Sequence, residues 1–195
     1  ANIDIAATSD LKESHNLKVN GSSMAIMTKQ NRFTPEDLSL DFTTSPGGTS
    51  IKMLNGDLKI DGEMDCGYNG LFAAMDEVAR MNGSIMSGKS KLYHLDDYER
   101  VLPRISLDFK CGERNVLHNF LAFTGIGTKR ISVDAVISPK RGLNINGNIL
   151  GFSSGDVRLD SIKFVTRQHN EKLHYIMGGI GLHIASLNEE HSHNA

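Results

Sequence analysis

The segment Gly83–Ser90, with the sequence GSIMSGKS, matches a motif that performs chemistry in other proteins. It satisfies GxxxxGK[ST], in which backbone amides and a lysine surround nucleotide phosphates. That chemistry needs an apolar strand before the loop and a helix after it, so that the amides converge on the phosphate. The residues before Gly83 have helical periodicity instead. We therefore interpret this segment as a polar loop between helices and predict that Lys89 binds no phosphate.

Acidic residues occur as the neighbouring pairs Asp96-Asp97 and Glu189-Glu190. A glycosidase needs two carboxylates that face each other across a cleft, and adjacency in sequence does not provide this. Asp96 and Asp97 suit the first turn of a helix, where negative charge is favoured. No nucleophile-elbow pattern GxSxG is present. We therefore expect no catalytic residue, and we expect that the chain is not an enzyme.

The eight histidines and two cysteines do not have the spacing of a metal site. His118 falls on a predicted helix, whereas His174 and His183 alternate with apolar residues on predicted strands. His191 and His193 lie in a polar tail. Cys66 and Cys111 each end a predicted strand and are interpreted as partly buried thiols, with a disulfide in an oxidising compartment as the alternative. We expect neither a metal nor a cofactor.

The composition is that of a folded chain without a strong electrostatic preference. Of the 195 residues, 39% are hydrophobic and 23% charged, and the formal net charge is -2, so we expect no nucleic-acid partner. No apolar run approaches the roughly 18 residues of a membrane-spanning helix. The first residues are not a signal segment. We interpret the chain as a fragment of a longer protein.

Alternating apolar residues dominate the sequence and predict β-strands. The strand patterns are bounded by Asn20-Gly21, Pro46–Gly48, Asn55-Gly56 and Pro139–Gly142, which we interpret as turns. A change of parity near Ser161 predicts a bulge or break there. The last third of the chain again reads as strands.

Helical spacing interrupts the strand pattern after Gly67. Leu71, Phe72, Met75, Val78 and Ala79 predict an amphipathic helix over about 69–86. A second helix is predicted over 96–102, stopped by Pro103. Asn115 is predicted to cap a third short helix. These patterns indicate a single β-rich segment over residues 1–187, with a helical insertion at about 69–103 and a polar tail over 188–195.

Strand alternation further predicts that one set of side chains forms a continuous apolar inner surface, because every second side chain of a strand points to the same side. The fold class expected is therefore mainly β (α+β). The expected architecture is a curved, largely antiparallel sheet that forms an apolar groove, with an inserted pair of amphipathic helices. The candidate groove residues are Leu38, Leu40, Phe42, Leu58, Ile60, Ile105, Leu107, Phe109, Ile131, Val133, Leu143 and Ile145.

Several segments together resemble repeats of the large TamB-like, or AsmA-like, envelope proteins of Bacteroides-type bacteria. They are Ser138–Gly147 followed by Arg158–Phe164, Gly56–Ile60 leading into a helix, and Val101-Leu102-Pro103 before a strand. The likeness covers most of the chain, from about Ile3 to Met177.

This resemblance implies a β-taco-like sheet with an apolar interior that carries phospholipid or other acyl chains between membranes, or assists outer-membrane protein assembly. It implies a place in the periplasm of a Gram-negative bacterium, an anchor outside this fragment, and an outer-membrane barrel assembly partner for the full-length protein. It transfers no catalytic residues. The cysteines belong to no pattern of the family.

Two other classes of protein remain as alternatives. A β-sandwich adhesin or glycan-binding module would have two packed sheets and exposed aromatic platforms, but the chain has only four Tyr and no Trp. An enzyme would be either a nucleotide-binding protein that uses Gly83–Ser90 or a β-helix hydrolase. Stabilisation by nucleotide would support the first of these enzymes.

Overall fold

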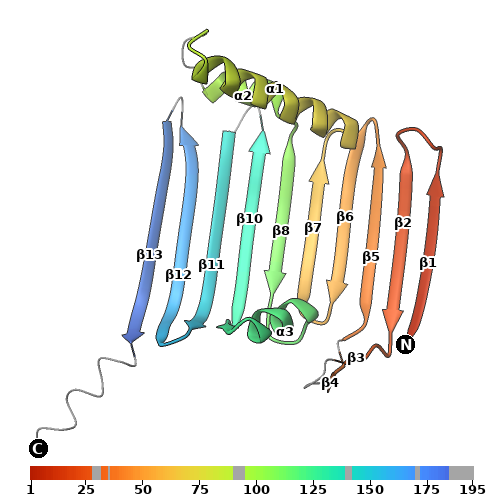
Figure 1. Ribbon diagram of the computed structural model, residues 1–195, viewed down its shortest axis with the longest axis vertical. Coiled ribbons are helices and arrows are strands. Elements are labelled where there is room, and N and C mark those ends of the chain that lie inside the picture. The colour runs from red at the N-terminus through yellow and green to blue at the C-terminus, as the bar shows by residue number, and fades with distance from the viewer. Residues whose placement is uncertain (28–31, 35, 90–94, 139–141, 170–171, 185–195) are drawn as a thin grey trace, which may run out of the picture.

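The computed structural model describes residues 1–27, 32–34, 36–89, 95–138, 142–169 and 172–184. Most of them form one open, curved, antiparallel sheet of 11 strands, in which each main strand pairs with the next along the chain (Figure 1). The main strands, in spatial order, are β1 (Asn2–Ser9), β2 (His15–Ser22), β5 (Leu38–Ser45), β6 (Gly48–Asn55), β7 (Leu58–Met64), β8 (Ile105–Cys111), β10 (Arg130–Ser138), β11 (Gly142–Ser154), β12 (Val157–His169) and β13 (Lys172–Ile184).

The described residues also form three short strands. The pair β3 (Ile26–Met27) and β4 (Arg32–Phe33) forms a separate two-stranded sheet, and β9 (Ile126–Gly127) pairs with β11. The prediction of a mainly antiparallel β fold is therefore confirmed. The β-sandwich alternative is wrong for the residues described, because they form one large sheet and one small ribbon rather than two packed sheets.

Tight turns connect neighbouring strands at two of the positions where the sequence predicted turns. Pro46-Gly47 joins β5 to β6, and Gly56-Asp57 joins β6 to β7. Gly56 has a φ of +59°, a conformation that a side chain disfavours. Residues 139–141 of the turn predicted before Gly142 lie outside the described residues.

Of two further local predictions about the strands, one is wrong and one is confirmed in part. Asn20-Gly21 is not a turn but lies within β2, where the two residues pair with Ser39 and Leu38. Pairing with β5 there outweighs the local turn preference of the Asn-Gly pair. The interruption predicted near Ser161 is present as a break and not as a bulge: the pairing of β12 with both β11 and β13 skips Asp160, while the register is the same on either side, so no extra residue is inserted.

The three helices found in the described residues lie at the ends of the strands. Helix α1 (Tyr68–Met86) and helix α2 (Leu95–Val101) connect β7 to β8, and α3 (Val116–Phe123) follows β8. Figure 1 shows α1 crossing the sheet at one end and α3 at the other. Asn115 caps α3 as predicted, because its side-chain oxygen accepts a hydrogen bond from the His118 amide at 2.7 Å.

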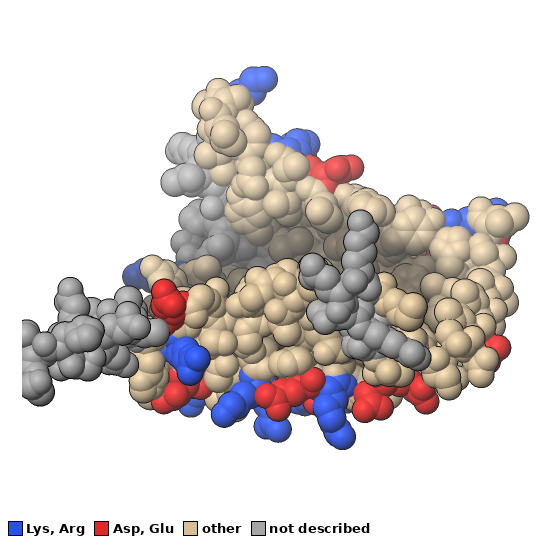
Figure 2. Space-filling view, turned by 60° about the horizontal axis from the view of Figure 1, so that its bottom comes forward, with Lys and Arg blue, Asp and Glu red and all other residues tan. Residues whose placement is uncertain are grey.

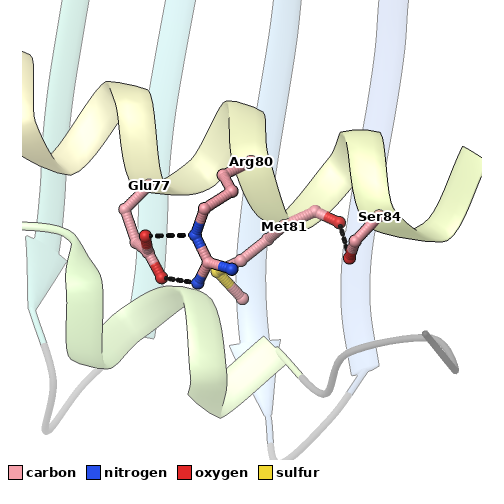
Figure 3. A network of polar contacts seen from close by, with 4 residues as sticks. All are labelled: Glu77, Arg80, Met81 and Ser84. Atoms are coloured by element: carbon pink, nitrogen blue, oxygen red, sulfur yellow. Dashed lines mark hydrogen bonds and ion pairs between the residues drawn. The ribbon is translucent and has the colours of Figure 1, made fainter. Parts of the chain in front are cut away.

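Helix α1 turns only part of the predicted apolar stripe inward: Leu71 and Val78 are half-buried, beside two buried residues that the prediction did not include. Ala74 and Met81 are buried, whereas Phe72 and Met75 remain exposed. Figure 3 shows Glu77 and Arg80 paired beside Met81, with Arg80 Nε donating to Glu77 Oε2 at 2.7 Å. Ser84 Oγ donates to the Met81 carbonyl at 2.8 Å. The apolar residues of α1 therefore divide between a buried stripe and an exposed one.

A buried polar cluster ties the β6–β7 turn to the loop before α3. Asn55 and Asn115 are each 1% exposed. Asn55 Oδ1 accepts from the Val116 amide at 2.7 Å, and Asn115 Nδ2 donates to Asp57 Oδ1 at 2.7 Å. The Asp57 carboxylate also accepts the amides of Glu113 and Arg114. These bonds join segments more than 50 residues apart and fix the end of the sheet near α3.

Acid should weaken this cluster. Burial raises the pKa of Asp57, but hydrogen bonds from Asn115 and from the amides of Arg114 and Glu113 outweigh burial and leave the pKa below its ordinary value. A lowered pKa in the folded state gives stability that is fully present above the unfolded pKa of about 3.9 and is lost as pH falls through the folded pKa.

We expect Asp57→Asn to lower the free energy of unfolding at pH 7 by about 2 kcal/mol, the scale of hydrogen bonds to a charged group. Below pH 4 the difference from wild type should shrink. Urea denaturation from pH 3 to 7 measures this, with the exposed turn variant Asp156→Asn as the control for charge. A constant difference across that range would contradict the expectation.

Candidate functional site

One face of the sheet, here called the inner face, carries apolar side chains on nearly every strand. Residues that pair across strands share a face, so the register aligns them in rows. The middle row crosses all ten main strands without interruption. It consists of Ile5, Val19, Leu40, Met53, Ile60, Phe109, Val133, Gly147, Phe164 and Met177.

The single glycine of the middle row does not leave a gap. A side chain at Gly147 would collide with the ring of Phe164, its partner on β12. The aromatic ring therefore covers the glycine, and apolar surface continues from β10 to β12. Gly62 on β7 is covered in the same way by its partner Ile51, whose Cγ2 lies 2.9 Å from the position that a Cβ at residue 62 would take.

The register places all twelve candidate residues on the inner face. Leu40, Ile60, Phe109 and Val133 lie in the middle row, and the other eight lie in rows beside it: Phe42, Leu107 and Ile145; Leu38, Leu58 and Ile131; Ile105 and Leu143. Strand alternation alone was sufficient to group them. The same signal marks further members of this face that the prediction omitted, such as Val19, Met53 and Phe164.

Little of the inner face is fully covered. Eleven of the twelve candidate residues are half-buried, and only Leu58 is buried, at 2% exposure. In the part of the chain that the structure describes, the other buried apolar residues are Ala74, Met81 and Cys111. A sheet face that packs against a second layer would bury most of its side chains. The inner face instead keeps apolar surface in contact with solvent.

The opposite, outer face is charged. Residues one position along each strand from the middle row point to this outer face. They include Lys18, Asp41, Lys52, Asp61, Asp108 and Asp134, which pair in register. Lys18 Nζ lies 3.0 Å from Asp41 Oδ2, and Lys110 Nζ lies 2.8 Å from Asp108 Oδ2. The hydrogen bond from Lys110 lowers the pKa of Asp108. Figure 2 shows Lys, Arg, Asp and Glu side chains gathered along one face of the molecule, and a hollowed surface with few charged side chains on the other side.

Exposed apolar residues also occur on the helices and on the last strand of the sheet. Phe72 and Met75 are exposed on α1, and Phe120 and Phe123 on α3. The edge strand β13 exposes large apolar side chains as well: Leu173, Tyr175, Ile176, Met177, Ile180 and Leu182. The sequence showed that these residues were apolar but not that they would remain uncovered.

The segment that matches the nucleotide motif has a different geometry from a phosphate-binding loop. Its first residues complete α1, and the amides of Ser87, Gly88 and Lys89 donate to the carbonyls of Gly83, Ile85 and Ser84. Those amides are thus engaged within the segment and do not converge on an external group. Ser90 lies outside the described residues.

The other residues considered for chemistry are dispersed. Asp97 lies on α2, His118 on α3, and His174 and His183 are exposed on β13. The described residues contain no group of three or more His, Cys, Asp or Glu side chains that could hold a metal ion. His191, His193 and Glu189-Glu190 lie outside the described residues.

The two cysteines lie at opposite ends of the strands. Cys66 follows the end of β7 whose Met64 pairs with Ile105, whereas Cys111 is the last residue of β8. Both are free thiols, and burial raises the pKa of each. A disulfide between them does not fit this arrangement.

No protein-family model matches the sequence, and neither the curated proteins nor the solved structures include a significant match. In the described parts of the chain, none of the helices has the length and apolar character to cross a bilayer.

Proposed function

We propose that the inner face forms an apolar groove that binds the acyl chains of phospholipids or similar lipids. The observation that carries the proposal is the apolar row across ten strands whose side chains are mostly half-buried. An acyl chain needs only apolar area, and each methylene removed from water contributes about 0.8 kcal/mol. The charged outer face would stay in water.

In this proposal the chain is a segment of a TamB-like envelope protein and has no enzymatic role. Its place would be the periplasm, with an anchor outside this segment, and its groove would move phospholipid between membranes or assist assembly of outer-membrane barrels. The sequence resemblance supports this context. The open sheet with one apolar and one charged face supports the lipid-binding part of the proposal.

A photoreactive residue tests the groove directly. Ala135 on β10 pairs with Leu107 on β8 and with Ile145 on β11, so a benzophenone side chain at this position would lie between two candidate residues. The labelled protein is mixed with phospholipid vesicles, irradiated and analysed by mass spectrometry for lipid adducts. Lipids that co-purify with the unlabelled protein are identified in parallel.

We expect Ile145→Asp and Leu107→Asp each to lower lipid capture at least about tenfold, because a carboxylate against an acyl chain is poorly solvated. Both positions are half-buried, so the variants should still fold. The matched control is Asn146→Asp, which places the same charge one residue away on the outer face. Absence of capture by the wild-type protein, or equal capture by all variants, would refute the groove.

A further inference from the structure

A polar depression of about 740 Å³ lies where β11, β12 and β13 end near the β11–β12 turn. Five ionisable residues line it: Lys129, Asp156, Arg158, Asp160 and His183. His183 Nε2 lies 3.9 Å from Asp160 Oδ1. This concentration of charge contrasts with the adjoining inner face, and the proposed acyl-chain site does not use it.

Two glycines position side chains beside this depression. Gly151 on β11 and Gly181 on β13 flank Asp160 on β12, and they have φ values of +63° and +70°. The space where Gly151 would carry a Cβ is occupied by Lys129, whose Cγ lies 2.7 Å from that position. The corresponding space at Gly181 is filled by the Asp160 carboxylate. The two glycines thus leave room for a cation over β11 and for an anion over β13.

The balance of charge indicates the kind of ligand. Lys129 and Arg158 supply two cations, whereas Asp156 and Asp160 supply two carboxylates, so the lining is close to neutral when His183 is neutral. A purely anionic group would meet two repelling carboxylates. A group that carries a phosphate and a primary ammonium can pair with both signs through charge-assisted hydrogen bonds.

The depression lies next to the inner face along the strands. Lys129, Gly151 and Asp160 each lie two residues from a member of the apolar row Ile131, Ile149 and Ile162, which pair in register. Two residues of a strand span about 7 Å. A lipid whose acyl chains lie on the inner face can therefore reach this depression with its headgroup.

We infer that the depression binds the zwitterionic phosphoethanolamine headgroup of a phospholipid, with Lys129 and Arg158 at the phosphate and Asp160 at the ammonium. The inference rests on the proposed function, because it requires acyl chains on the inner face. It adds a selectivity to that function: the groove accepts acyl chains of any lipid, whereas the polar end distinguishes headgroups.

Lipid capture at position 135 tests this selectivity. Vesicles contain equal amounts of phosphatidylethanolamine, phosphatidylglycerol and diacylglycerol in a phosphatidylcholine background, and adducts are counted for each lipid. Wild type should favour phosphatidylethanolamine over phosphatidylglycerol about fivefold, the effect of about 1 kcal/mol. Lys129→Gln and Asp160→Asn should each abolish the preference and leave diacylglycerol capture unchanged. Lys163→Gln, which removes a cation from the outer face of β12, is the control and should behave as wild type.

The outcomes separate the two proposals. Capture of no lipid at all, diacylglycerol included, refutes the groove itself. Equal capture of all headgroups, or a preference that survives both Lys129→Gln and Asp160→Asn, overturns only the headgroup site. Inorganic phosphate is added as a competitor, and loss of the preference at millimolar phosphate would assign the depression to free phosphate instead of a lipid.

Discussion

Leu58→Asp should prevent the protein from folding or cost at least about 4 kcal/mol, because it places an unpaired carboxylate where the side chain is buried. Leu58 is 2% exposed and begins β7 next to the cluster formed by Asn55, Asp57 and Asn115. The groups of that cluster already have partners, so a new carboxylate would find no donor in it. Thermal and urea denaturation followed by circular dichroism measure the loss.

Leu54→Asp is the matched control for this variant. Leu54 lies on β6 and is 52% exposed, in the outer-face row that contains Lys59, its partner on β7. The same substitution should change the free energy of unfolding by less than about 0.5 kcal/mol there. If Leu58→Asp were as stable as Leu54→Asp, the end of the sheet near α3 would be open to water, and the buried region described above would be wrong.

Gly56→Ala should be the second severe substitution, with an expected loss of about 3 kcal/mol or more. Gly56 has a φ of +59°, which costs a residue with a Cβ about 1 kcal/mol. The added Cβ would also collide with the backbone carbonyl of Arg114, which belongs to the loop before α3. Relief of that collision would move the loop and break the hydrogen bonds that Asp57 accepts from it.

Gly155→Ala separates the cost of the positive φ from the cost of the collision with Arg114. Gly155 has a similar φ of +55° in the β11–β12 turn, and no atom lies within 4 Å of the position that its Cβ would take. Its loss should therefore be limited to the conformational cost of about 1 kcal/mol. Equal losses for Gly56→Ala and Gly155→Ala in urea denaturation would mean that close contact with Arg114 contributes nothing.

Much of the fold followed from patterns a few residues long. Alternation in Leu38–Phe42 and Ile105–Phe109 predicted strands and their shared face, and helical spacing after Gly67 predicted α1. The turns at Pro46-Gly47 and Asn55-Gly56 were also local. These features depend on the geometry of one strand or one helix, in which side-chain direction repeats at a fixed period whatever the chain meets elsewhere.

Errors arose where a distant segment decided the outcome. Asn20-Gly21 has the local signature of a turn, but pairing with β5 keeps it extended. The stripe of α1 that faces inward is set by what the helix packs against, so Ala74 is buried while the larger Phe72 is exposed. Periodicity predicts that such a helix is amphipathic but does not fix which apolar residues are covered when apolar residues occupy more than one stripe.

For the candidate site, the sequence by itself determined that twelve residues share one apolar face, because alternation is a property of each strand. Only the tertiary structure decided that Leu58 is covered while Leu107 and Ile145 remain half-buried, since coverage depends on which segments pack on the sheet. The same holds for the polar depression. Lys129, Asp160 and His183 are far apart in sequence, and only the pairing of β10, β11, β12 and β13 in one sheet brings them together.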